Sequence, residues 1–213
     1  AGTAPADPGP RARPRVRGGA RVYREGALRP RKEVPRVELR HIVVNPNGSC
    51  SLIGEQFWMR ERNDYNMTGG YFTRQVFYFM DLILVKYAPD GQLSWEKVIP
   101  KRQESVNDEG LYSSIALANR GEELFIVFND DEKNLEIIND PGNNNLRNFN
   151  VLKSDPSYIR IDKDGNLERL SPLKGKNGQF KLRPIDSIQC SKNHLAILAS
   201  RNGLERFCLF ELD

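Results

Sequence analysis

Residues 41–57, HIVVNPNGSCSLIGEQF, decide the fold, because the same design recurs twice further along the chain. An apolar run, a polar turn and a second apolar run appear again in SIALANRGEELFIVFND (114–130) and SIQCSKNHLAILASRNG (187–203). Short apolar runs separated by turn residues predict β-strands, and a regular repeat predicts tandem copies of one structural unit. The isoleucines that share a place in the three segments are evenly spaced along the chain: Ile42, Ile115 and Ile188.

A second shared stretch follows the first two of these segments. DLILVKYAPDGQLSWEKVIP begins at Asp81 and SYIRIDKDGNLERLSPL begins at Ser157, with Asp-Gly turns at 90–91 and 164–165. Asp-Gly and Asn-Gly pairs tolerate the positive φ of tight hairpins, so each unit encodes four strands. We therefore predict an all-β fold of tandem four-stranded antiparallel blades, a partial β-propeller-like array. Trp95, just past the first Asp-Gly turn, is expected to pack between blades.

The repeat sets the predicted domain boundaries. The blades span about 39–100, 112–172 and 185–213, the last without its fourth strand. Residues 19–38 are expected to hold the outer strand of a preceding blade plus a linker, because GARVYREGALRP resembles GQLSWEKVIP from Gly91. Residues 1–18 are rich in Arg and Pro and contain one large apolar residue, which predicts a disordered arm.

Charge is distributed unevenly along the chain. Residues 1–40 carry ten arginines and one lysine against four acidic side chains, so the remaining residues have a net charge of −3 although the whole chain has +4. A weakly acidic body is a poor platform for nucleic acid. No apolar run is long enough for a membrane span, and the start of the chain lacks the apolar stretch of a signal peptide.

The sequence contains no recognisable motif for catalysis or metal binding, so we expect no catalytic residue, no metal and no cofactor. The three cysteines do not form a C-x-x-C pair and are expected to be free thiols, and the two histidines are expected to be structural. Residues 162–166, DKDGN, lack the distal Glu of a calcium loop and are interpreted as a hairpin turn. Residues 129–132, NDDE, are interpreted as a solvated turn, with a hard-cation site as the alternative. Lys101 and Arg102 are interpreted as a solvated connection between blades.

The stretch FWMRERNDYNMTGGYFTRQVF (57–77) is predicted to be an insertion between two strands of the first blade. It interleaves aromatic rings with arginines, a combination found at recognition surfaces. The alternative is that the rings pack over the blade edge and cover it. The candidate binding residues are Trp58, Arg60, Tyr65, Tyr71 and Phe72.

A resemblance supports the propeller-like interpretation. The chain from about residue 40 resembles uncharacterised bacterial β-propeller-like repeat proteins, through an Asp-Gly turn, a nearby Trp, the run IPKRQ and a strand that ends in FND. The resemblance implies a fold and a secreted or envelope setting, and it implies no activity. The matching residues are Asp90, Gly91, Trp95, Ile99, Pro100, Lys101, Arg102, Gln103, Phe128, Asn129 and Asp130.

The leading hypothesis for function is a non-enzymatic module that binds a protein or a glycan through the segments 57–77 and 130–156. One alternative is a fragment of a propeller enzyme whose site is completed by other blades. Another is nucleic-acid binding through the basic arm, which the acidic body disfavours. Unpaired blade edges also predict self-association.

Overall fold

The computed structural model divides the chain into a first unit, residues 1–34, and a second unit, residues 35–213. It describes residues 36–65, 67–135, 145–149, 154–170, 181–201 and 203–212, all in the second unit. The predicted arm at 1–18 and the predicted outer strand within 19–38 therefore lie outside the described residues, apart from the last few positions of the second range.

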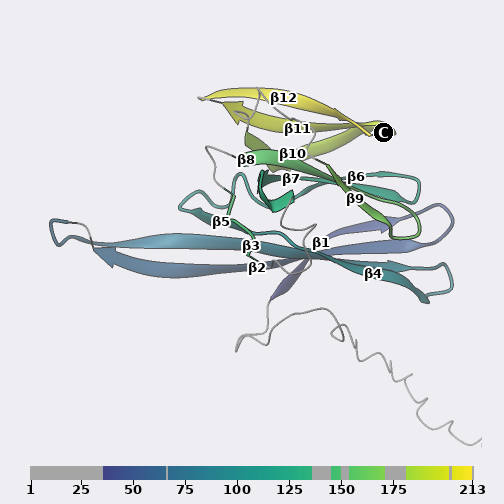
Figure 1. Ribbon diagram of the computed structural model, residues 1–213, viewed down its shortest axis with the longest axis horizontal. Helices are drawn as coiled ribbons and strands as arrows, with labels where there is room; N and C mark the ends of the chain where they lie inside the picture. Colours follow the sequence, from purple (N-terminus) through teal and green to yellow (C-terminus); the bar gives the residue numbers. More distant parts are fainter. Residues whose placement is uncertain are drawn as a thin grey trace, which may run out of the picture. The chain divides into compact units, whose positions relative to one another are not determined.

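The first sheet is built from consecutive antiparallel strands (Figure 1). Neighbouring strands are joined by tight turns, and a short fifth strand pairs with the outer half of β3. The strands are β1 (Val37–Val44), β2 (Cys50–Tyr65), β3 (Tyr71–Tyr87), β4 (Leu93–Ile99) and β5 (Gln103–Val106).

The second sheet has four strands and the third sheet has three within the described residues. All pairings in both sheets are antiparallel and join strands that follow one another in the chain. The second sheet consists of β6 (Ala116–Arg120), β7 (Glu123–Asp131), β8 (Ser154–Ile161) and β9 (Leu167–Leu170). The third consists of β10 (Lys181–Ser191), β11 (His194–Arg201) and β12 (Leu204–Glu211).

The hairpin turns lie where the Asn-Gly and Asp-Gly pairs predict them. Gly48, Gly91 and Gly165 have φ of +86°, +82° and +82°, in the region that glycine alone occupies without strain. Asp162 closes its turn by accepting hydrogen bonds from the amides of Asp164 and Asn166, at 2.9 and 2.8 Å. The turn interpretation of residues 162–166 is therefore confirmed.

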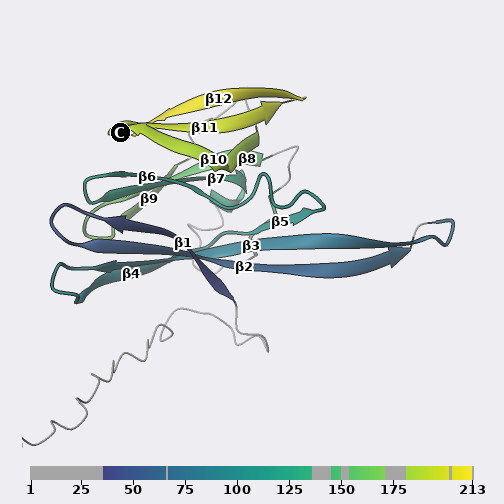
Figure 2. The ribbon, with the colours of Figure 1, turned by 180° about the vertical axis from the view of Figure 1, so that it is seen from behind.

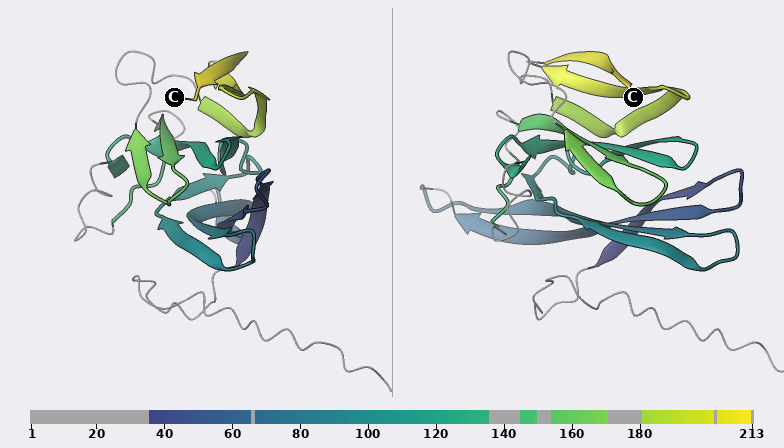
Figure 3. Two further views of the ribbon diagram at one scale, coloured as in Figure 1. Left: turned by 90° about the vertical axis from the view of Figure 1, so that its right-hand side faces the viewer. Right: turned by 45° about the vertical axis from the view of Figure 1, so that its right-hand side comes forward.

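Two apolar clusters hold the three sheets in a stack (Figure 3). The first cluster joins the first and second sheets and includes Ile53, Leu84, Ile126 and Ile159. The second joins the second and third sheets. It includes Phe125, Val127, Leu182, Leu195, Ile197 and Ala199. Because β7 contributes alternate residues to both clusters, the second sheet is buried on both faces.

Strand register shows that the sheets stack with the same polarity. Ile53 pairs with Leu84 in the first sheet, and this pair faces the second sheet. Val127 pairs with Tyr158 in the second sheet, and this pair faces the third. Leu84 and Tyr158 are equivalent, because each precedes the Asp-Gly turn of its own sheet by the same number of positions. We call the side of a sheet that faces the next sheet in the chain its rear face and the other side its front face.

Register also corrects the expected equivalence of the three isoleucines. Ile42 pairs with Leu52, and the residue in the corresponding place of the second sheet is Leu117, which pairs with Ile126. Ile115 precedes β6. The even spacing of the isoleucines does not reflect equivalent positions, because the β1–β2 turn is five residues long and the β6–β7 turn is two.

Candidate functional site

The segment predicted to be an inserted loop is instead the outer half of a long hairpin. β1 stops pairing with β2 at Gln56, yet β2 and β3 continue to pair with each other as far as Tyr65 and Tyr71. Figures 1 and 2 show this part extending past the other strands. The prediction of an insertion is wrong because charged residues such as those of RERND have low strand propensity, and the partner strand overrides that propensity. We call residues 58–65 and 71–78 the ribbon.

One side of the ribbon, the basic face, carries aromatic rings and arginines. Trp58 stacks on Tyr78 across the two strands, with ring centroids 5.0 Å apart and an interplanar angle of 14°. Arg62 and Arg74 are directly opposite each other, and Asp64 lies 3.2 and 3.1 Å from their Nε atoms. Two like charges at opposed positions destabilise a strand pair, so this arrangement depends on Asp64. Phe72 and Arg60 lie on the same face.

The opposite side of the ribbon begins with Met59 opposite Phe77, continues with polar side chains and ends in two tyrosines. Tyr65 and Tyr71 meet edge to face, with centroids 5.7 Å apart, and their exposed fractions are 73% and 60%. Nearer the sheet, a shallow hollow on the surface is formed entirely by polar and acidic residues. The residues that line it are Glu61, Thr73, Gln75, Asn107 and Glu109.

The five candidate binding residues therefore divide between two faces. Trp58, Arg60 and Phe72 lie on the basic face, whereas Tyr65 and Tyr71 lie on the other. The division follows from the two-residue period of a strand, which sends alternate side chains to opposite sides. The alternative that these rings cover a blade edge fails for Tyr65 and Tyr71, because both are largely exposed.

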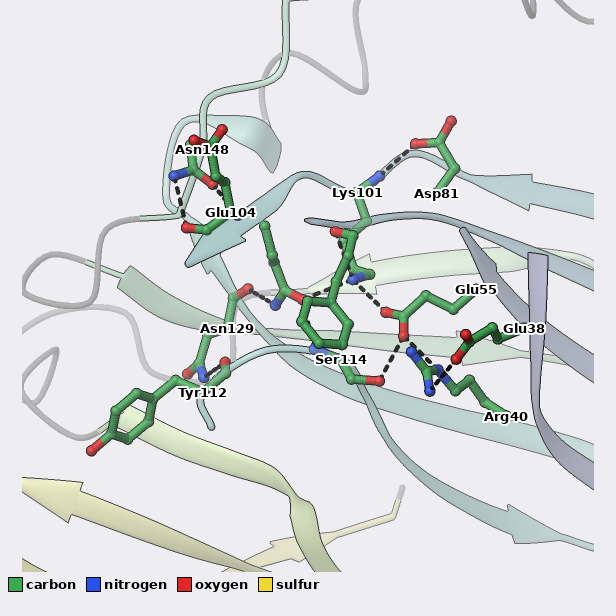
Figure 4. Close-up of polar contacts among 12 residues, drawn as sticks. Glu38, Arg40, Glu55, Asp81, Lys101, Glu104, Tyr112, Ser114, Asn129 and Asn148 are labelled. Carbon is green, nitrogen blue, oxygen red and sulfur yellow. Dashed lines mark hydrogen bonds and ion pairs between the residues drawn. The ribbon is translucent and has the colours of Figure 1, made fainter. Parts of the chain in front are cut away.

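A buried ion pair lies where the ribbon joins the first sheet (Figure 4). The side chains of Glu55 and Lys101 are both fully buried, with Lys101 Nζ 2.6 Å from Glu55 Oε1. Glu55 Oε2 accepts hydrogen bonds from Arg40 Nε at 2.8 Å and from Ser114 Oγ at 2.7 Å. Burial lowers the pKa of Lys101, and the Glu55 carboxylate opposes that shift. The interpretation of Lys101 as part of a solvated connection is therefore wrong.

The polar network continues from Lys101 through the second sheet to the third. Lys101 Nζ donates to Gln103 Oε1 at 2.7 Å, and Gln103 Nε2 donates to the Asn129 carbonyl at 2.8 Å. Asn129 Nδ2 donates to the Leu182 carbonyl at 2.7 Å, and Asn129 Oδ1 accepts from the Leu182 amide at 3.1 Å. One chain of hydrogen bonds thus crosses both interfaces between the sheets.

The NDDE segment lies in the sheet rather than in a solvated turn at its first two positions. Asn129 and Asp130 are buried in β7, and Asp130 pairs with Arg169 and accepts from Asn134 Nδ2 at 2.7 Å. Burial raises the pKa of Asp130, and the Arg169 guanidinium opposes that shift. The solvated-turn interpretation is wrong here because partners distant in sequence allow both side chains to be buried: Arg169 forms an ion pair with Asp130, and the backbone of Leu182 forms hydrogen bonds with Asn129.

A second polar contact joins the first and second sheets at their turns. Glu122 Oε1 lies 2.8 Å from Lys86 Nζ and accepts from Ser49 Oγ at 3.1 Å. These contacts, together with Asn47, lower the pKa of Glu122 to about 2. Trp95 Nε1 donates to the Lys163 carbonyl at 3.1 Å, so the expected packing of Trp95 against the following sheet is observed.

The sequence patterns did not predict that Glu55, Gln103 and Asn129 belong to one hydrogen-bond network. The only indication in the sequence is that each is a polar residue in a strand, at a position that faces the protein interior. Within the described residues, no group of three or more His, Cys, Asp or Glu could hold a metal ion, and the three cysteines are free. The same residues include no helix long and apolar enough to cross a membrane. No known protein family, curated protein or solved structure matches the chain.

Proposed function

We propose that the chain is a module of propeller-like tandem sheets that binds a partner protein through the basic face of the ribbon. The observation that carries the proposal is the extension of the β2–β3 hairpin past β1 and, beyond Arg60 and Val76, past β5 as well, among the described residues. An isolated two-stranded ribbon is marginally stable, so the five outermost residues of each strand, 61–65 and 71–75, have a cost that pairing with a third strand does not offset.

The side chains of the basic face are those that recur at the centres of protein interfaces. Trp, Tyr and Arg are enriched among the residues that dominate binding energy. Trp58 and Tyr78 lie opposite each other on the basic face, and Arg60 is the next residue of β2 on that face. Even with Asp64 paired to Arg62 and Arg74, the basic face keeps an excess of arginine, because Arg60 lies on it too, so it favours a partner that brings carboxylates.

The backbone of β2 offers a second means of recognition. From Trp58 to Tyr65 no described strand pairs with the outer edge of β2. An extended segment of a partner can add to such an edge by main-chain hydrogen bonds, with side chains supplying specificity. The charged residues along β2 hinder unspecific pairing between copies, which is the usual protection of an exposed edge.

A protein partner fits the ribbon better than a glycan. Glycan sites place aromatic platforms inside a cleft with polar groups, and here the hollow lined by Glu61 and Gln75 contains no aromatic side chain. The aromatic rings lie on a flat ribbon instead. The two remaining hypotheses, an enzyme completed by further blades and nucleic-acid binding by the arm, gain no observation from the described residues.

The test compares two variants of the full chain that alter opposite faces of the ribbon. The Trp58→Ala/Arg60→Ala variant should lose at least about tenfold in affinity for the partner, the effect of one interface anchor. The Tyr65→Ala/Tyr71→Ala variant is the matched control and should bind as the wild type does. Proteins cross-linked to each immobilised variant in extracts of the producing cells are quantified by mass spectrometry, and thermal unfolding checks that both variants fold.

Two outcomes would contradict the proposal. If both variants capture the same proteins as the wild type, the ribbon is not the binding surface. If glycan arrays show a ligand whose binding requires Trp58, the module binds carbohydrate and the protein assignment is wrong.

A further inference from the structure

The front face of the first sheet is apolar and uncovered among the described residues. Ile42 and Val44 on β1 are 57% and 70% exposed, and Val98 on β4 is 50% exposed. Register places these side chains on the side away from the second sheet, because their neighbours Val43 and Ile99 belong to the first cluster. Further exposed apolar residues of this sheet are Val37, Leu39 and Leu93.

The rear face of the third sheet has the same character. Ile188, Phe207 and Leu209 are 66%, 77% and 63% exposed. Ile188 and Leu209 both pair with Ala196 on β11, and Phe207 pairs with Leu198. The β11 residues that alternate with Ala196 and Leu198 are buried against the second sheet. Contiguous apolar surface of this kind marks an interaction site.

Both interfaces within the molecule join a rear face to a front face. Phe125 and Val127 on the rear face of the second sheet are fully buried and pack against the front face of the third sheet. Leu198 and Phe207 occupy the corresponding side of the third sheet, where nothing described covers them. The two uncovered faces are therefore a rear face and a front face, which is the combination that already packs twice within this chain.

We propose that the rear face of the third sheet in one copy of this chain packs on the front face of the first sheet in a second copy. The contact continues the series of interfaces already present, with the same polarity. Arg183 and Glu205 lie on the rear face of the third sheet too, and their opposite charges neutralise each other across 2.7 Å. Heterologous contacts between two copies close a ring when the rotation permits. Two copies of three sheets make six, within the range of about four to eight blades in propellers.

The experiment measures the mass of the full chain in solution by light scattering, with one charged substitution on each face. The wild type should have twice the chain mass of 24.3 kDa. Phe207→Glu and Val44→Glu should each be monomeric, because each destroys one side of both contacts. An equimolar mixture of the two variants should recover the double mass, because one of the two contacts then joins unmodified faces.

Lys192→Glu, in the β10–β11 turn and outside both faces, is the control and should keep the wild-type mass. Both test positions are already exposed, so the variants should fold, and circular dichroism checks this. A monomeric wild type overturns the proposal. Sensitivity to only one of the two substitutions overturns it as well, since that pattern indicates contact between identical faces. An assembly larger than two chains excludes the two-copy ring.

Discussion

At the scale of single residues, side-chain amides join neighbouring sheets by forming the two backbone hydrogen bonds that a neighbouring strand would otherwise form. Asn129 donates to the carbonyl of Leu182 and accepts from its amide, and Gln189 forms the same pair of bonds with Asn119. Asn129 belongs to the second sheet and bonds to the third, whereas Gln189 belongs to the third sheet and bonds to the second. Each satisfies two backbone groups that would otherwise lie unpaired at an interface, which costs about 1–3 kcal/mol per group.

The buried ion pair gives the clearest prediction at this scale. Lys101→Met should lower the free energy of unfolding by about 3 kcal/mol or more, because Glu55 keeps a buried charge without its principal partner. The double variant Lys101→Met/Glu55→Gln should be more stable than Lys101→Met alone. Urea unfolding followed by tryptophan fluorescence measures these values together with that of Glu55→Gln alone, and strictly additive losses would show that the two side chains are not coupled.

Such residues could not be predicted from the sequence. Lys101 follows a Pro and precedes an Arg, which locally indicates a solvated connection, and its burial depends on Glu55, which lies far earlier in the chain. Charged side chains are buried only with partners, and partners are a property of the tertiary structure. The apolar positions of β7, by contrast, were evident as a continuous run.

At the scale of elements, the turns were the most predictable feature. A positive φ is a local demand that Gly meets at no steric cost, so Asp-Gly and Asn-Gly pairs indicate hairpins whatever surrounds them. The ribbon was less predictable, because its strand residues are charged and its cross-strand partners, such as Trp58 and Tyr78, become visible only with the register.

The two equivalent Asp-Gly turns allow a matched test of the first interface. Gly91 and Gly165 both have φ of +82°, but a Cβ at Gly91 would meet nothing within 4 Å, whereas one at Gly165 would lie 2.9 Å from the Trp95 ring. Gly91→Ala should cost about 1–2 kcal/mol of stability from backbone strain alone. Gly165→Ala should cost about 1–3 kcal/mol more from overpacking.

Thermal and urea unfolding measure the two losses, and a change in tryptophan emission, to which only Trp58 contributes besides Trp95, reports whether the Trp95 ring moves. Equal losses in the two variants would mean that the Trp95 contact adds nothing to the interface between the first and second sheets.

At the scale of the whole molecule, the repeat predicted tandem sheets but not their polarity. The repeated segments have similar apolar patterns whichever way the sheets stack, and a shift of register by a single position exchanges the two faces of a strand. The polarity becomes clear only when Ile53 and Val127 are seen to face the next sheet. Among the described residues, the second sheet is then buried on both sides, whereas the first and the third each have one uncovered face.

Unequal burial predicts unequal stability along the stack. The second sheet should open only with global unfolding, whereas β10–β12 should open locally, because one apolar cluster and the amide contacts of Asn129 and Gln189 hold the third sheet in place. In Asn129→Ala, amide hydrogen exchange in β10–β12 should accelerate by about tenfold or more, the effect of losing about 1.4 kcal/mol, while exchange in β2 and β3 stays unchanged. Mass spectrometry of peptic peptides measures this, with Thr73→Ala, which removes only an exposed hydrogen bond to Asn63, as the control. Acceleration across all three sheets would show instead that the stack unfolds as a single cooperative unit and that the third sheet has no independent opening.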